Sequence, residues 1–67
     1  MPLVQITCIE GRTAEQKNAM ARRVTEAVAE TMGVKAEQVR LLLYEVPGAH
    51  WYVGGEPKGP PKPAEAG

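Results

Sequence analysis

The sequence predicts an α/β (α+β) fold, a βαβ subunit in which two parallel strands are joined by one crossover helix. Two apolar, β-prone segments, 3–9 and 39–46, flank a segment of helical periodicity between residues 13 and 32. About 30 residues separate the two predicted strands, enough for a right-handed crossover that leaves them parallel. The chain has 67 residues, so we expect one small domain.

The first predicted strand, Leu3–Ile9, alternates in a way that indicates one covered face. Val4, Ile6 and Cys8 form its more apolar side, which suits a strand half covered by a helix. Pro2 fits the position that opens the strand, because its missing N–H removes no ladder hydrogen bond there.

The predicted helix begins after Thr13, which forms a capping-box pattern with Gln16. Gly33 suits the position that ends it. One apolar stripe runs along it at three- and four-residue spacing, made by Met20, Val24, Ala27, Val28 and Met32, or Thr31 in place of Met32.

The second predicted strand, Val39–Val46, follows a tight turn or single helical turn and is apolar on both faces apart from Arg40 and Glu45. One helix can cover one face of a two-stranded sheet. The other face then needs a second subunit, so the sequence predicts an obligate oligomer.

Beyond the second strand, Pro47-Gly48 turns the chain, and residues 50–53 suit a short strand or hairpin arm before Gly54-Gly55. From residue 56 the composition shifts to Pro, Lys, Ala, Glu and Gly without apolar periodicity. We therefore expect a folded domain over residues 2–55 and a Pro-rich, flexible tail over 56–67.

Composition excludes several classes of function. Eight basic residues balance eight acidic ones, which predicts no nucleic-acid or membrane partner. The single cysteine, Cys8, excludes an internal disulfide, and the single histidine, His50, leaves no metal-ligand cluster, so we expect no metal and no cofactor. Without a signal peptide or a membrane-spanning stretch, a cytoplasmic protein is expected.

The Met1-Pro2 start carries a chemical possibility of its own. Methionine before a small residue is normally trimmed, which would leave Pro2 with a free secondary amine on a rigid ring. That amine could act as a base or nucleophile, and no other position in the chain can supply it. If Met1 stays, Pro2 is an ordinary amide and a non-catalytic oligomeric binding module is favoured.

In this order, the residues resemble the 4-oxalocrotonate tautomerase family over roughly Pro2 to Gly55. The resemblance rests on Met1-Pro2, Ile9-Glu10-Gly11-Arg12, Thr13-Ala14-Glu15-Gln16-Lys17, Val39-Arg40, His50-Trp51 and Gly54-Gly55. It implies a βαβ subunit with a short C-terminal hairpin that assembles as a homohexamer, a trimer of dimers. Its activity would be isomerisation of an unsaturated dicarboxylate, 2-hydroxymuconate to 2-oxohex-3-enedioate, without a cofactor.

The same resemblance implies roles for particular residues. Pro2 would be the general base after Met1 is removed, and Arg12 would hold the distal carboxylate of the substrate. Arg40, donated by a neighbouring subunit, would engage the 2-oxygen and its adjacent carboxylate. The backbone amide of Ile9 would touch substrate. Trp51 would form an apolar wall where the family usually has phenylalanine, a change that bears on substrate range.

Other interpretations stay open at this point. Without the family, Arg12 suits a solvated surface position, Arg40 needs a partner or solvent, and Trp51 suits a core or interface. Related proline-dependent enzymes tautomerise phenylpyruvate-type enols, decarboxylate malonate semialdehyde or dehalogenate haloacrylates. Val53 stands where the dehalogenases place a glutamate, which argues against hydration chemistry.

Overall fold

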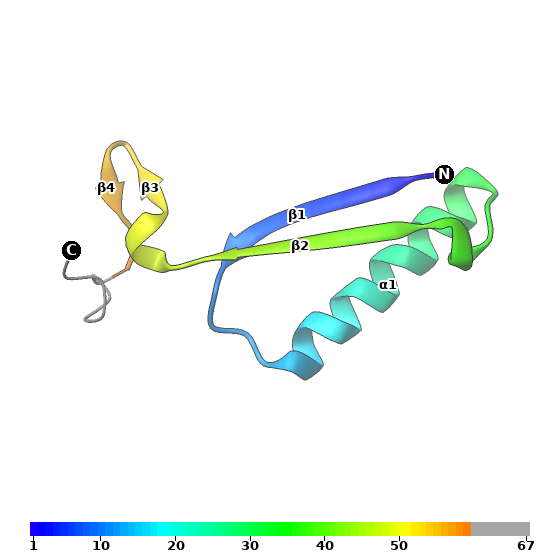
Figure 1. Cartoon of the computed structure of the whole chain (residues 1–67), viewed down its shortest axis with the longest axis horizontal. Helices are drawn as coiled ribbons and strands as arrows, with labels where there is room; N and C mark the ends of the chain where they lie inside the picture. The colour runs from blue at the N-terminus through cyan, green and yellow to red at the C-terminus, as the bar shows by residue number, and fades with distance from the viewer. Residues whose placement is uncertain (60–67) are drawn as a thin grey trace.

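The structure is a computed structural model that describes residues 1–59. A two-stranded sheet has one helix on one face, and a small hairpin extends from the end of the sheet opposite the N-terminus (Figure 1). The elements in chain order are β1 (Leu3–Ile9), α1 (Ala14–Met32), the 3-10 helix η1 (Ala36–Gln38), β2 (Arg40–Val46), the 3-10 helix η2 (Gly48–His50), β3 (Tyr52–Val53) and β4 (Glu56–Pro57). The predicted βαβ subunit with a short C-terminal hairpin is confirmed.

Strands β1 and β2 pair in parallel from Leu3↔Arg40 to Ile9↔Val46. The Arg40 N–H donates to the Pro2 carbonyl at 3.0 Å just before the paired segment, and the Glu10 N–H donates to the Val46 carbonyl at 2.8 Å just after it. Pro2 therefore opens the ladder through its carbonyl, as expected for a residue without an N–H.

The helix covers one face of the sheet, and the other face is open. On the helix side, Val4, Ile6, Leu41 and Leu43 are half-buried, as the alternation predicted. On the open side large apolar side chains remain exposed, namely Leu3 at 55%, Leu42 at 44% and Tyr44 at 47%. Within residues 1–59 the one buried apolar residue is Val39, at 8% exposed. A single chain thus leaves most of its apolar surface uncovered.

Helix α1 has the predicted caps. The Thr13 side chain accepts from the Gln16 N–H at 3.1 Å, and the Gln16 side chain accepts from the Thr13 N–H at 3.0 Å. Gly33 ends the helix in the left-handed conformation, with φ 70°. The predicted stripe was wrong at two positions: Ala27 and Met32 are exposed, because Ala27 lies at the margin of the covered arc and Met32 is the last helical residue.

The second strand begins one residue later than predicted. Val39 ends η1, where its N–H donates to the Ala36 carbonyl at 3.0 Å, and β2 begins at Arg40. The turn expected before this strand is therefore a single 3-10 turn, η1. It also places Val39 in the most buried position of the described chain.

The hairpin pairs β3 with β4 through Tyr52↔Pro57 and Val53↔Glu56. Gly54 and Gly55 connect them with φ values of 60° and 85°, which suits the two-residue turn that hairpins favour. His50 belongs to η2, so the third strand is shorter than the expected 50–53. Strand β4 also lies inside the segment predicted as a tail, and residues 60–67 of that predicted tail lie outside the described residues.

At its base the hairpin touches η2 backbone to backbone. The Gly59 N–H donates to the Gly48 carbonyl at 3.0 Å, and a Cβ added to Gly48 would lie 3.0 Å from the Gly59 Cα. Both positions therefore need glycine, and this contact fixes the hairpin against the end of β2. No helix within residues 1–59 is long and apolar enough to cross a bilayer.

Candidate active site

Pro2 lies at the end of the sheet where both parallel strands begin. Its carbonyl accepts from the Arg40 N–H, and the residue is half-buried. Met1 is 82% exposed, so its removal would disturb little packing. The predicted base therefore occupies a fixed position beside β2, with the preceding residue in solvent.

Arg40 adjoins Pro2 through its main chain, and its side chain turns elsewhere. The Arg40 Nη1 donates to the Glu37 carbonyl at 2.7 Å, at the end of η1. Arg40 is exposed and lies on the same face of the sheet as its register partner Leu3, which is the open face. The hydrogen-bond partner of the Arg40 side chain is thus a backbone carbonyl. The Arg40 guanidinium remains accessible to solvent.

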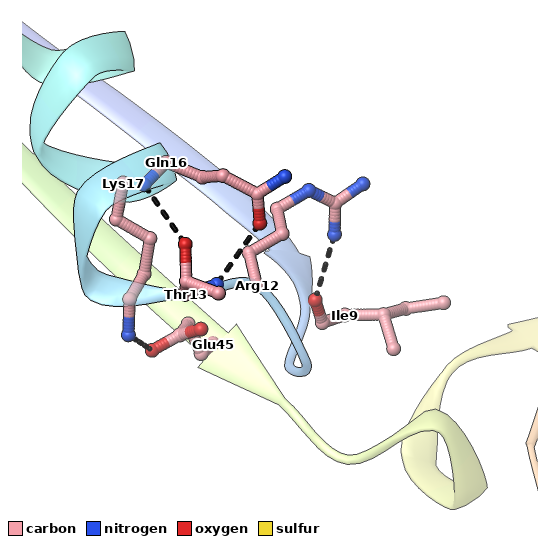
Figure 2. A network of polar contacts seen from close by, with 6 residues as sticks. All are labelled: Ile9, Arg12, Thr13, Gln16, Lys17 and Glu45. Carbon is pink, nitrogen blue, oxygen red and sulfur yellow. Dashed lines mark hydrogen bonds and ion pairs between the residues drawn. The ribbon is translucent and has the colours of Figure 1, made fainter.

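Arg12 lies at the opposite end of the sheet, in the connection from β1 to α1. Gly11, with φ 130°, turns the chain, and Arg12 directly precedes the capping residue Thr13. Figure 2 shows the Arg12 side chain folded back so that Nη1 donates to the Ile9 carbonyl at 3.2 Å. Arg12 is exposed, and the structure brings it together with Ile9.

Ile9 presents its backbone to the outer edge of β1. At the two ends of the β1–β2 ladder, the residues adjoining β1 that hydrogen-bond to β2 are Pro2 and Glu10, and both are even-numbered. Because alternate residues of a parallel strand bond to the same neighbour, the odd-numbered Ile9 directs its N–H away from β2. This orientation is compatible with the predicted contact between that amide and a substrate.

Trp51 lies at the same end of the sheet as Ile9. Its N–H donates to the Gly48 carbonyl at 3.2 Å, and its carbonyl accepts from the Lys58 N–H at 2.8 Å. A Cβ on Gly48 would lie 3.7 Å from the Ile9 Cγ2, which places η2 beside the end of β1. Trp51 is half-buried between η2 and the hairpin.

The predicted site residues therefore form two groups at opposite ends of β1. Pro2 and the Arg40 main chain lie at one end, and Arg12, Ile9 and Trp51 lie at the other. The seven residues of β1, at a rise of about 3.3 Å each, separate the groups by roughly 20 Å or more. One chain does not bring both groups to a small substrate.

Sequence reasoning missed a polar cluster around Arg12. The Lys17 Nζ lies 2.9 Å from the Glu45 Oε1, which links α1 to β2 (Figure 2). Beside this ion pair is a groove of about 240 Å³, lined by Ile6, Cys8, Arg12, Gln16, Lys17, Met20 and Leu43. The signal that could have found the pair is Glu45, an acid on the helix side of an otherwise apolar strand.

Cys8 contributes its side chain to the wall of this groove, in keeping with a small packing residue. Among residues 1–59 no group of three or more His, Cys, Asp or Glu side chains could hold a metal ion.

Comparison with known proteins agrees with this architecture. The family model described as "Tautomerase enzyme" matches residues 2–60. A Ralstonia nicotianae protein named "Probable tautomerase" is 47% identical over 70 residues, covering 98% of this chain and all of its own length. The 2-hydroxymuconate tautomerase of Pseudomonas sp. strain CF600 is 47% identical over 57 residues, or 85% of this chain and 90% of its own.

A solved structure gives the same result. The heterohexamer 4-oxalocrotonate tautomerase of Chloroflexus aurantiacus J-10-fl contains a chain that superposes with a TM-score of 0.83. That chain is 42% identical, and the match covers 98% of each chain. With its βαβ fold, Met1-Pro2 start and C-terminal hairpin, this chain belongs to the tautomerase family.

Proposed function

We propose that this protein is an isomerase that converts 2-hydroxymuconate, or a closely related 2-hydroxy dienedioate, to its 2-oxo form, with the amine of processed Pro2 as general base. The 47% identity to a 2-hydroxymuconate tautomerase supports this substrate class. The residues that the family resemblance assigns to a dicarboxylate, Arg12 and Arg40, are both exposed cations here.

The observation that carries the proposal is the placement of the two residue groups at opposite ends of one sheet. A base at one end of β1 and a carboxylate-binding arginine at the other cannot act on one small molecule within a subunit. When two subunits meet in opposite directions, the Pro2 of one lies near the Arg12 and Trp51 of the other. Each site is then completed by neighbouring chains.

The surface of the single chain supports such an assembly. Residues on the open face, Leu3, Leu42 and Tyr44, are each more than two-fifths exposed, with values of 55%, 44% and 47%. Both strands of the β1–β2 sheet also have an outer edge, which can pair with another chain. We propose a homohexamer, built as a trimer of dimers, in which the open face and the β1 edge are covered.

The chemistry follows from the proton movements in the reaction. The Pro2 nitrogen takes the proton from the 2-hydroxyl of the dienol, the C2–O bond becomes a carbonyl, and the double bonds shift along the chain. The same nitrogen then returns the proton to C5. One base that serves two positions suits a rigid ring amine, and a base poised near the working pH contributes about 10²–10⁴-fold.

The arginines supply anchoring and electrostatic stabilisation. Arg12 would bind the distal carboxylate, for which a planar guanidinium fork is well suited. Arg40 from a neighbouring subunit would stabilise negative charge on the 2-oxygen, a contribution of about 3–4 kcal/mol in comparable sites. Positive charge near the Pro2 amine also disfavours its protonated form, which lowers the pKa of that amine toward neutrality.

Ultraviolet-monitored ketonisation of 2-hydroxymuconate tests the proposal, with protein whose intact mass confirms loss of Met1. We expect turnover well above the buffer rate across neutral pH, and a large loss in Arg12→Ala and Arg40→Ala. A rate equal to buffer with Met1 absent would refute the dicarboxylate reaction. Monocarboxylate enols such as phenylpyruvate would then be the next substrates to assay.

A further inference from the structure

We propose that the Lys17–Glu45 ion pair is a positioning device for Arg12, and through Arg12 a determinant of selectivity for substrates with a distal carboxylate. The inference rests on the proposed function, in which Arg12 binds that carboxylate. Lys17 and Glu45 are positioning residues here, since neither is placed against substrate.

The pair joins two elements that are distant in sequence. Lys17 lies in the first turns of α1 and Glu45 next to the end of β2, 28 residues apart, with 2.9 Å between Nζ and Oε1. The Lys17 side chain is 29% exposed and the Glu45 side chain is 27% exposed, so both charges are partly shielded from water. A partly shielded pair is screened less by solvent and salt than a fully exposed one.

Glu45 occupies a position that otherwise suits an apolar residue. It shares the helix side of the sheet with Leu41 and Leu43 and is the register partner of Cys8. Glu45 is an exposed residue, and Lys17 reaches its carboxylate from the helix. The pairing therefore explains the acid in the strand and fixes where the start of α1 lies over the sheet.

A groove interrupts the apolar packing at this end of α1. The groove of about 240 Å³ lies between the sheet residues Ile6 and Leu43 and the helix residue Met20. Side chains that line the groove have fewer packing partners there than elsewhere along the helix, so a polar link between α1 and β2 adds to the apolar contacts at this end. The ion pair spans from α1 to β2 beside the groove and links its two walls.

Arg12 is attached directly to the end that the pair holds. It is bonded to the capping residue Thr13, whose reciprocal hydrogen bonds with Gln16 make the first turn of α1 rigid. On the N-terminal side of Arg12, Gly11 has no side chain and a φ of 130°, which permits the turn of the chain there. The backbone of Arg12 is thus held next to the helix end that Lys17 and Glu45 link to β2, while its guanidinium donates to the Ile9 carbonyl at 3.2 Å (Figure 2).

The test compares two substrates that differ in the distal carboxylate. The dicarboxylate is 2-hydroxymuconate, and the monocarboxylate is 2-hydroxypenta-2,4-dienoate, a dienol without the second acid. In Lys17→Met and Glu45→Gln we expect KM for the dicarboxylate to rise on the order of tenfold, because a displaced Arg12 would lose about one charge-assisted hydrogen bond to the distal carboxylate. KM for the monocarboxylate should stay unchanged, with kcat little altered for either.

Two further variants separate positioning from stability. The charge swap Lys17→Glu with Glu45→Lys restores an ion pair and is expected to recover most of the lost KM, even if Lys17→Met fails to assemble. Arg23→Met removes one exposed positive charge from α1 and should leave both KM values unchanged. A swap that assembles but keeps the defect, or single variants that raise both KM values equally, would overturn the proposal.

Failure of the proposed function would look different. In that case wild-type protein would not turn over the dicarboxylate, or Arg12→Ala would not discriminate between the two substrates. If Arg12→Ala discriminates and the Lys17 and Glu45 variants do not, the reaction stands and the positioning role is refuted.

Discussion

Mixing two inactive variants tests the division of the active site between subunits. The first variant is Pro2→Leu, which retains Met1 because a bulky second residue prevents trimming and so removes the proline amine. The second is Arg12→Ala, which removes the cation proposed to bind the distal carboxylate. Each variant alone should have little activity on 2-hydroxymuconate.

The expected recovery follows from the geometry. Pro2 and Arg12 of one chain are separated by β1, roughly 20 Å or more at about 3.3 Å per residue. The carboxylates of a six-carbon substrate are about 6–7 Å apart, from carbon–carbon bonds near 1.5 Å. Each site must then take Pro2 and Arg12 from different chains, and an equal random mixture gives both intact groups in about one half times one half, or one quarter, of the sites.

The assay is ketonisation of 2-hydroxymuconate after the two variants are unfolded and refolded together, with native mass spectrometry to confirm mixed oligomers. About one quarter of wild-type activity should return, above the summed activity of the unmixed variants. Every chain carries one defect, so only a site built from two chains can have both groups intact. Mixed oligomers without recovered activity would therefore exclude a site shared between subunits.

A companion mixture addresses Arg40. Its main chain adjoins Pro2 in the same chain, while its guanidinium turns to the Glu37 carbonyl on the open face. If a neighbouring subunit donates Arg40, as proposed, mixing Pro2→Leu with Arg40→Ala should also recover about one quarter of the activity. No recovery would assign Pro2 and Arg40 of each site to one chain.

Three other predictions concern the hairpin, the open face and the base. Gly48→Ala should lower the free energy of unfolding by about 1–3 kcal/mol in thermal denaturation, because its Cβ would lie 3.0 Å from the Gly59 Cα; an unchanged melting temperature would contradict this close contact. Leu42→Lys places a charge on the face proposed to be covered and should dissociate the oligomer in sedimentation velocity, whereas an unaltered sedimentation coefficient would count against that interface. Arg40→Gln removes a positive charge near Pro2, which raises the pKa of the amine and should move the acidic limb of the kcat/KM profile to higher pH; a limb that stays in place would exclude Arg40 as a cause of the lowered pKa.

Much of the fold could be predicted because its signals are local. The caps of α1 join residues close in sequence, Thr13 with Gln16 and Gly33 with Ala29, and the capping residues behave as their types suggest. The predicted bounds of β1 match the structure, since alternation stops at Glu10. Parallel pairing followed from the length of the crossover.

What could not be predicted depends on contacts distant in sequence. Lys17 and Glu45 are 28 residues apart, and neither has a pattern that names the other as partner. Strand β4 has two residues and a proline, and it exists because it pairs with β3 and because Gly59 packs on Gly48. Composition alone assigned those residues to a tail.

The candidate site was predicted as a set of residues, and their arrangement was not. The resemblance named Pro2, Arg12, Arg40, Ile9 and Trp51, but a sequence does not show which of them share a chain in one site. The structure separates Pro2 from Arg12 and leaves the open face exposed. These two facts make assembly a requirement of the proposed chemistry.

The most direct test of the account compares the ketonisation rate of 2-hydroxymuconate by two forms of the same chain, one without Met1 and one with Met1 retained, both verified by intact mass and assembled to the same size. If Pro2 is the base, kcat should fall at least about 100-fold when Met1 blocks its amine, the lower range of general-base catalysis. Equal rates for the two forms would contradict Pro2 as the base.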